Sequence, residues 1–236
     1  AYEYTSKGNL VAVVSNGTAI LGLGDRGALA SKPVMEGKGV LFKKFADIDV
    51  FDIELNSHDP DEIIKVVAAI SPTFGGINLE DIKAPECFYI EEELKKMLDI
   101  PVFHDDQHGT AVVVLAGLIN ALKVVDKKME NLEIIIIGAG AAGTAIAKLL
   151  HAAKVRNIVV VDSKQAISQS RNDLTSFKQE LAKFNTLNKT GSLAEVLTGA
   201  DVVIGVSKAG LIKPEMVSSM NQDAIVFALA NPEPEI

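Results

Sequence analysis

Two pairs of adjacent acidic residues, Glu80-Asp81 and Asp105-Asp106, have the side-chain types and spacing that suit metal chemistry. Each pair follows a short apolar segment that the sequence predicts as a strand, Ile77 to Leu79 and Pro101 to Phe103. Because the carboxyl ends of parallel strands meet at one edge of a sheet, these acids are expected to gather there. Carboxylates without a cysteine or histidine cluster favour a hard divalent cation, Mg²⁺ or Mn²⁺. On spacing alone, helix caps and solvated turns remain the alternative.

The adjacency of the two acids in each pair sets a condition on this interpretation. Neighbouring side chains in a strand point to opposite faces of the sheet. Both acids of one pair can therefore serve the same ion only if the chain bends at that point. Lys38, in the segment Met-Glu-Gly-Lys-Gly, carries no such signal, because taken alone it is one of many lysines.

A second chemical pattern is the glycine-rich segment Gly138-Ala-Gly-Ala-Ala-Gly143. Four isoleucines, Ile134 to Ile137, precede it and predict a strand buried on both faces. A helix from Ala141, a strand from Ile158 to Val161 and the acid Asp162 are expected to follow. This order is typical of a dinucleotide site, with pyrophosphate at the helix N-terminus and the acid on the ribose. The candidate cofactor-binding residues of this unit are Gly138, Ala139, Gly140, Ala141, Ala142, Gly143 and Asp162.

The same glycine pattern occurs a second time, from Gly22 to Gly27. Pro33 follows this copy and is expected to break the helix that a dinucleotide motif requires. We therefore assign cofactor binding to the copy that begins at Gly138.

Composition and charge exclude several classes of protein. Hydrophobic residues make up 48% of the 236 residues and charged residues 23%, so a packed core is expected rather than disorder. A net charge of −8 disfavours nucleic acid and anionic membrane surfaces as partners. The longest apolar stretches are interrupted by polar residues and glycines, which argues against a membrane span. The single cysteine, Cys87, is consistent with a cytoplasmic protein.

Predicted strands alternate with predicted helices almost throughout, so the expected class is α/β. Leu10–Val14 and Thr18–Leu23 are expected to form a hairpin around Asn16-Gly17. A helix is expected from Pro60 to Ile70, with acids in its first turn. The domain boundary is predicted near Asp106. Residues 1–106 then form a substrate- and metal-binding domain, and residues 107–236 a doubly wound Rossmann-type dinucleotide domain.

Several longer segments resemble the malic enzymes of the short bacterial kind. The resemblance is carried by Gly8–Asp25, Lys32–Phe45, Pro72–Ile82, Pro101–Ala111, Gly138–Gly143 and Phe227–Ile236. It implies oxidative decarboxylation of L-malate to pyruvate and CO₂, with reduction of NAD or, alternatively, NADP. It further implies Mg²⁺ or Mn²⁺ as a cofactor and a homodimer as the assembly.

The resemblance also implies roles for single residues. Glu80, Asp81 and Asp106 fall on the metal ligands, Lys38 on the general base and Asp105 on its charge partner. Asn231 falls on an asparagine that meets substrate and nicotinamide, and Ser207 joins the cofactor-binding set. Asp162 disfavours the extra phosphate of NADP, although Lys164 is close enough to offset its charge.

The chain also departs from the family pattern. The family's N-terminal tyrosine motif, which supplies an acid, is absent. By the resemblance, both ends of the chain are expected to be truncated and the second domain to be incomplete at its C-terminus. Ala19 stands where larger relatives place a substrate-binding arginine. A malolactic enzyme that forms lactate with bound NAD and a non-catalytic nucleotide-binding module remain alternatives. A metal-free amino-acid dehydrogenase fits the two acidic pairs less well.

Overall fold

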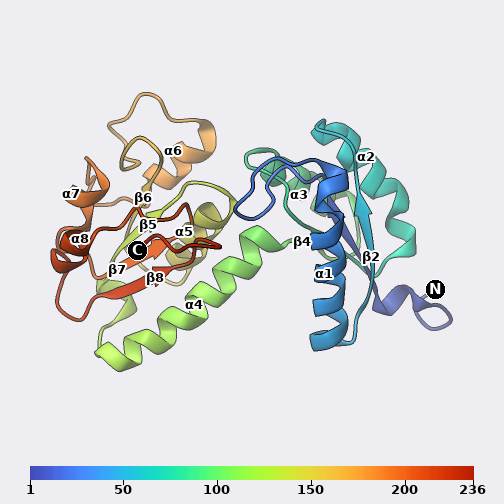
Figure 1. The fold of residues 1–236 in the computed structure, drawn as a ribbon, viewed down its shortest axis with the longest axis horizontal. Helices are drawn as coiled ribbons and strands as arrows, with labels where there is room; N and C mark the ends of the chain where they lie inside the picture. The colour runs from blue at the N-terminus through green and yellow to red at the C-terminus, as the bar shows by residue number, and fades with distance from the viewer. The chain divides into compact units, whose positions relative to one another are not determined.

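The chain folds into two compact units, Ala1–Asp106 and Gln107–Ile236, in a computed structural model that describes residues 1–236. Each unit is built on a four-stranded parallel sheet with helices packed against it (Figure 1). The α/β class predicted from the alternation of strands and helices is confirmed.

The first unit has the strand order β2-β1-β3-β4. Its elements are a 3₁₀ turn at Ser6–Asn9, β1 (Leu10–Ser15), α1 (Ala28–Ala46), β2 (Asp49–Glu54), α2 (Pro60–Ile70), a 3₁₀ turn at Ser71–Thr73, β3 (Gly76–Leu79), α3 (Glu86–Met97) and β4 (Val102–His104). Helix α2 has the predicted bounds. The Asp59 side chain caps it by accepting from the Asp61 N–H at 3.0 Å, and Pro60 occupies the first turn, where its missing N–H costs nothing.

The hairpin predicted at Asn16-Gly17 is wrong. Strand β1 pairs in parallel with both β2 and β3, and Thr18–Leu23 forms no strand. The turn itself exists, since Gly17 has φ +67° and the Asn16 side chain accepts from the Thr18 N–H. The chain then leaves the sheet, because the Ala19 N–H donates to the Asp81 carbonyl instead of to β1.

Helix α1 also differs from the prediction, because it continues through Pro33 for 19 residues. Pro33 has no N–H to donate to the carbonyl of Leu29. Because Leu29 is 89% exposed, water can donate to that carbonyl instead. A helix therefore does follow the glycines Gly22 to Gly27. No strand leads into them, since β1 ends at Ser15. This copy lacks the strand, rather than the helix, of a dinucleotide motif.

The second unit has the strand order β6-β5-β7-β8. Its elements are α4 (Asp105–Val125, which begins at the end of the first unit), a 3₁₀ turn at Met129–Asn131, β5 (Glu133–Ile137), α5 (Ala141–Ala152), β6 (Asn157–Val161), α6 (Ser176–Ala182), α7 (Leu193–Leu197), β7 (Val202–Gly205), α8 (Pro214–Ser218) and β8 (Ile225–Ala228). The strand, glycine turn, helix, strand and acid predicted around Gly138 occur in that order.

Strand β5 is buried on both faces, as its run of isoleucines predicts. Ile134 and Ile136 pack into a core formed with α4 and α5. Ile135 and Ile137 pack into a second core with residues of α7 and with Met216 and Val217 of α8. This alternation places β5 in the middle of three layers, with its carboxyl end free to carry a loop.

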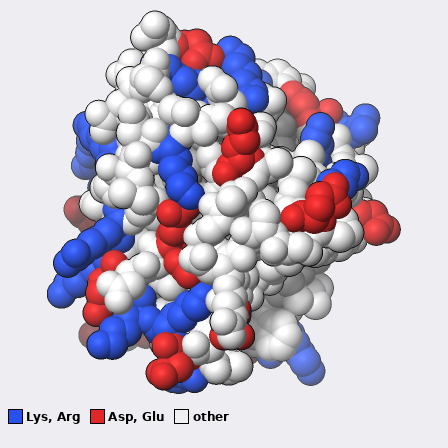
Figure 2. Space-filling view, turned by 90° about the vertical axis from the view of Figure 1, so that its left-hand side faces the viewer, with Lys and Arg blue, Asp and Glu red and all other residues white.

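Helix α4 passes the length and hydropathy test for a membrane span, with a mean hydropathy of 1.7. A mostly buried core helix passes the same test, whereas 22% of the apolar window of α4 is buried. Here Ala111, Val114, Leu118 and Leu122 lie in the core of the second unit. Figure 2 shows one face of the molecule, on which acidic and basic side chains are interspersed rather than gathered by sign.

Candidate functional site

The strand register of the first unit brings the two acidic pairs together. Strands β3 and β4 are parallel neighbours, and Leu79 pairs with His104. The residues that follow, Glu80 and Asp105, therefore leave the same edge of the sheet. Helix α4 begins at once with Asp105-Asp106 in its first turn, where negative charge is favoured.

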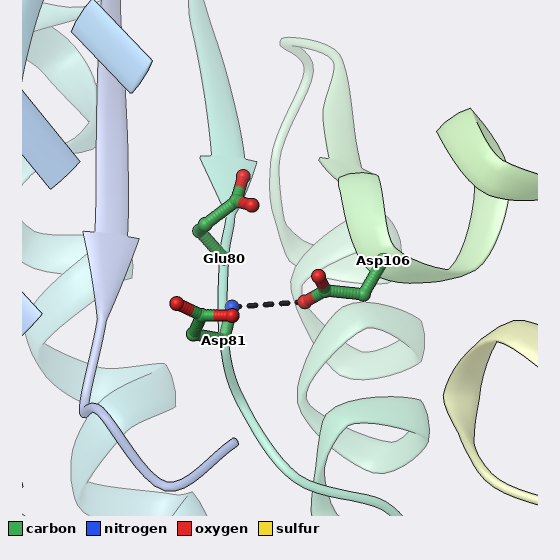
Figure 3. A group of neighbouring side chains, drawn as sticks. All are labelled: Glu80, Asp81 and Asp106. Carbon is green, nitrogen blue, oxygen red and sulfur yellow. Dashed lines mark hydrogen bonds between the residues drawn. The ribbon is translucent and has the colours of Figure 1, made fainter. Parts of the chain in front are cut away.

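The bend that the adjacent acids require occurs at Asp81. Its φ is +52°, in the left-handed region that aspartate tolerates better than most residues. The bend turns the Asp81 N–H toward Asp106, whose Oδ2 accepts it at 2.8 Å (Figure 3). Carboxylates from β3 and from the start of α4 thus converge instead of pointing to opposite faces.

The carboxylates of Glu80, Asp81 and Asp106 form a compact group that suits a hard cation. One oxygen of each lies within 4.8 Å of the others. Burial and the negative charge of Asp106 raise the pKa of Glu80 to about 8 and that of Asp81 to about 7. The Asp81 Oδ2 is buried without a hydrogen-bond partner. A divalent cation would offset the repulsion among the carboxylates and give the Asp81 Oδ2 a partner. The donor set therefore fits Mg²⁺ or Mn²⁺.

Lys38 reaches this group from α1. Its Nζ lies 2.7 Å from Asp105 Oδ2 and 3.0 Å from Glu80 Oε1. Burial lowers the pKa of Lys38, but the charges of Glu80 and Asp105 outweigh burial and raise the pKa above its ordinary value. Lys38 is therefore held as an ammonium ion while these carboxylates are charged. The geometry joins Lys38 and Asp105, the two residues predicted as base and charge partner.

Two further contacts hold the acidic group, and sequence reasoning did not find them. The Asn78 side chain donates to Glu80 Oε2 at 2.8 Å, from the preceding position on the same face of β3. Buried Glu91 of α3 accepts from the His104 N–H at 3.1 Å, which anchors the end of β4 just before Asp105. The alternation of a strand could have identified Asn78, whereas nothing in the sequence links Glu91 to His104.

In the second unit, the three glycines of the turn after β5 have different surroundings. Gly138 has φ +117°, and a Cβ there would lie 2.7 Å from the Val206 carbonyl oxygen. A Cβ at Gly143 would lie 1.8 Å from the Gly138 carbonyl oxygen, so α5 packs directly on the turn. A Cβ at Gly140 would meet nothing within 4 Å. Open space at that position is what a pyrophosphate needs to approach the backbone.

A cavity of about 660 Å³ opens beside this turn, at the switch point between β5 and β7. Of the predicted cofactor-binding residues, Gly138, Ala139, Gly140, Asp162 and Ser207 line it. Ala141, Ala142 and Gly143 lie in the first turn of α5 and are not in the lining, and neither is exposed Asn231. The lining also includes Lys164, Lys178 and Lys208, whose ammonium groups suit phosphate. Of these three lysines, only Lys164 was singled out from the sequence.

Asp162 lies at the end of β6 with its carboxylate held by four donors. Arg171 Nη1 lies 3.0 Å and Lys178 Nζ 2.6 Å from its oxygens, and the N–H groups of Lys164 and Gln165 complete the set. Burial opposes ionisation of Asp162, but these hydrogen bonds outweigh it and hold the pKa of the carboxyl well below its usual range. The negative charge of Asp162 in the lining of the cavity is thus offset by two cations.

Comparison with known protein families divides the chain at a similar position. The family described as "Malic enzyme, N-terminal domain" matches residues 2–95, and "Malic enzyme, NAD binding domain" matches residues 107–236. The first match contains the first of the two acidic pairs, and the second contains the dinucleotide unit.

Individual relatives are similar over the whole chain. The bifunctional malic/malolactic enzyme of Bacillus subtilis is 59% identical, and all of this chain aligns with 58% of that protein. The NADP-dependent malic enzyme of Escherichia coli is 56% identical, with the whole chain matching 31% of its length. The structure of the NAD-dependent malic enzyme from Thermotoga maritima superposes with a TM-score of 0.97 at 49% identity, over 100% of this chain and 63% of the other. The chain thus spans less than two thirds of the length of each of these relatives.

Proposed function

The chain belongs to the malic enzyme family, and from this premise we propose that the protein oxidises and decarboxylates L-malate. The products are pyruvate, CO₂ and reduced NAD(P), and the reaction requires Mg²⁺ or Mn²⁺. The observation that carries the proposal is the placement of Lys38 within 3.0 Å of both Asp105 and Glu80. A basic residue thus lies against the carboxylates that suit a metal, as removal of a proton from a substrate hydroxyl at this site requires.

Each residue of the acidic site has a distinct part in this reaction. Glu80, Asp81 and Asp106 would hold the cation. When bound, the cation would supply a Lewis acid for the malate oxygens and the dinucleotide a hydride acceptor. Lys38 Nζ takes the hydroxyl proton, for which it must be a neutral amine. Burial lowers the pKa of Lys38 whereas Glu80 and Asp105 raise it, so a cation that offsets the charge of these carboxylates would favour the neutral amine.

Asp105 keeps Lys38 in place through its 2.7 Å contact. Oxidation of the hydroxyl-bearing carbon makes the carboxylate β to it, on the adjacent CH₂ carbon, a leaving group, because the electron pair released with CO₂ passes to the new carbonyl. The carbon that has lost CO₂ is then protonated to give pyruvate, which balances the hydroxyl proton taken by Lys38. Atoms and electrons balance with one hydride delivered to the cofactor for each CO₂ released.

For the cofactor, we propose NAD as the preferred dinucleotide and NADP as a weaker alternative. Asp162 at the end of β6 suits a ribose diol and repels an added phosphate. Arg171 and Lys178 offset that charge, so the repulsion is only partial. Both cofactor types occur in the names of similar proteins, NADP in the Escherichia coli enzyme and NAD in the Thermotoga maritima enzyme.

A product assay tests the proposed reaction. The protein is supplied with L-malate, Mn²⁺ and either NAD or NADP, and the absorbance of reduced cofactor is followed while pyruvate and lactate are quantified. Equal amounts of reduced cofactor and pyruvate are expected, and a chelator should abolish both. Lactate without reduced cofactor would instead identify the malolactic reaction, which the name of the Bacillus subtilis relative includes. Binding of the dinucleotide without either product would favour a non-catalytic module.

A homodimer in the cytoplasm remains the prediction for the assembly and its location. Sedimentation equilibrium of the purified protein tests the assembly, and fractionation of cells tests the location.

A further inference from the structure

Glu235 is a fully buried carboxylate to which neither the proposed reaction nor the sequence motifs give a role. It lies in the loop after β8 and is 0% exposed, whereas the neighbouring residues Glu233 and Ile236 are exposed. Burying a charged group is costly unless hydrogen bonds compensate it. The contacts of Glu235 therefore indicate what the protein gains from it.

Both carboxylate oxygens of Glu235 accept hydrogen bonds from the backbone beyond two neighbouring strands. Oε1 accepts from the Ser207 N–H at 2.8 Å, just after β7. Oε2 accepts from the Ala230 N–H at 3.0 Å, just after β8. Strands β7 and β8 are parallel partners, so the carboxylate bridges their carboxyl ends. A carboxylate accepts at both oxygens, so this one side chain satisfies both converging N–H donors.

The fit of this side chain extends to the cofactor cavity. A Cβ at Gly205, the last residue of β7, would lie 2.3 Å from Glu235 Cδ, so the carboxylate occupies the space that this glycine leaves. On the other side, Gly138 approaches Val206 and Ser207 closely enough that a Cβ at Gly138 would lie 3.4 Å from Ser207 Cβ. Glu235 therefore packs against the end of β7, and the segment at Ser207 that follows packs against the glycine turn.

We propose that Glu235 is a positioning residue for the nicotinamide cofactor. Through Ser207 it fixes one wall of the cavity against the glycine turn. Through Ala230 it fixes the residue that precedes Asn231. This inference rests on the proposed function, because it takes the cavity to be the dinucleotide site.

The test compares Glu235→Ala and Glu235→Gln with the exposed control Glu233→Gln. The dissociation constant for NADH is measured by fluorescence titration, and thermal unfolding is recorded for each variant. Glu235→Ala is expected to weaken NADH binding about tenfold, because two hydrogen bonds to the cavity wall are lost. Glu235→Gln keeps one acceptor but turns an amide donor toward the other N–H, so about a threefold loss is expected. The control should bind NADH like the unmodified protein.

The dissociation constant separates positioning from simple stabilisation. A variant that is only less stable unfolds at a lower temperature, but its folded fraction binds NADH with unchanged affinity. If Glu235→Ala does not fold, Glu235→Gln decides. Wild-type affinity in the folded Glu235 variants, within about twofold, would overturn the inference. Since NADH binding needs no turnover, an unmodified protein that binds NADH without oxidising malate would refute the proposed function and leave this test valid.

Discussion

The acidic group should make the metal-free protein less stable than a variant that lacks one of its charges. Glu80→Gln replaces a buried carboxyl by an isosteric neutral amide. Burial and the charge of Asp106 raise the pKa of Glu80 from 4.5 to about 8. In the unfolded chain Glu80 ionises at its ordinary pKa. The folded state therefore binds the extra proton between these values, and the stability of the unmodified protein falls as pH rises through this range.

The size of the effect follows from the two pKa values. Their difference, about 3.5, corresponds to about 5 kcal/mol at roughly 1.36 kcal/mol per pKa unit. Proton uptake by neighbouring carboxyls and loss of the 3.0 Å contact with Lys38 reduce the gain. We expect Glu80→Gln to be more stable by about 2 kcal/mol above pH 8, with the difference vanishing near pH 4.5.

Urea unfolding in the presence of a chelator, at several pH values, measures this difference. Glu3→Gln, an exposed carboxyl of the same unit, serves as the control and should leave stability unchanged at every pH. Adding Mn²⁺ should reverse the order, because only the unmodified protein keeps all three ligands and gains binding free energy on folding. A Glu80→Gln variant that is less stable without metal, or whose stability difference does not change with pH, would refute the reasoning.

Other substitutions test the remaining parts of the site. Lys38→Ala should lower malate oxidation by at least about 10²-fold and leave NADH affinity unchanged, as rate assays and titrations would show, while exposed Lys44→Ala should alter neither. Asp162→Asn should raise the KM for NAD and shift the ratio of kcat/KM values toward NADP by about tenfold, because two cations lose their anionic partner; an unaltered ratio would show that Asp162 does not read the ribose. Gly143→Ala should destabilise the fold by about 3 kcal/mol in urea unfolding, since its Cβ would lie 1.8 Å from a backbone oxygen. Gly140→Ala, whose Cβ meets open space, should keep its stability and weaken cofactor binding, and equal stability of the two glycine variants would contradict this assignment.

The dinucleotide unit could be predicted from the sequence because its signals are local. Strand β5, the glycine turn, α5 and β6 follow one another without interruption, and close backbone contacts explain the glycines at Gly138 and Gly143. The prediction of a hairpin at Asn16-Gly17 was wrong because the pairing of β1 is not local. A turn signal describes four residues, whereas the partners of β1 are β2 and β3, and parallel pairing leaves no local mark.

The acidic site was predictable only in part. Adjacent acids after two strands indicated the sheet edge, but the left-handed conformation of Asp81, which makes them converge, is not encoded in spacing. Lys38 has no distinguishing neighbours, and its partner Asp105 is 67 positions away, so only the family resemblance identified it. The clamp of Arg171 and Lys178 on Asp162 was missed because it forms in a polar segment that resembles exposed surface.

Transfer of a labelled hydride tests the central claim most directly. The protein is incubated with L-malate carrying deuterium at the hydroxyl-bearing carbon, together with NAD and Mn²⁺, and the products are analysed by mass spectrometry. The proposed reaction predicts deuterium in the reduced nicotinamide and an equal amount of unlabelled pyruvate. Deuterium retained in lactate, or pyruvate formed without labelled cofactor, would contradict net oxidation of malate by this protein.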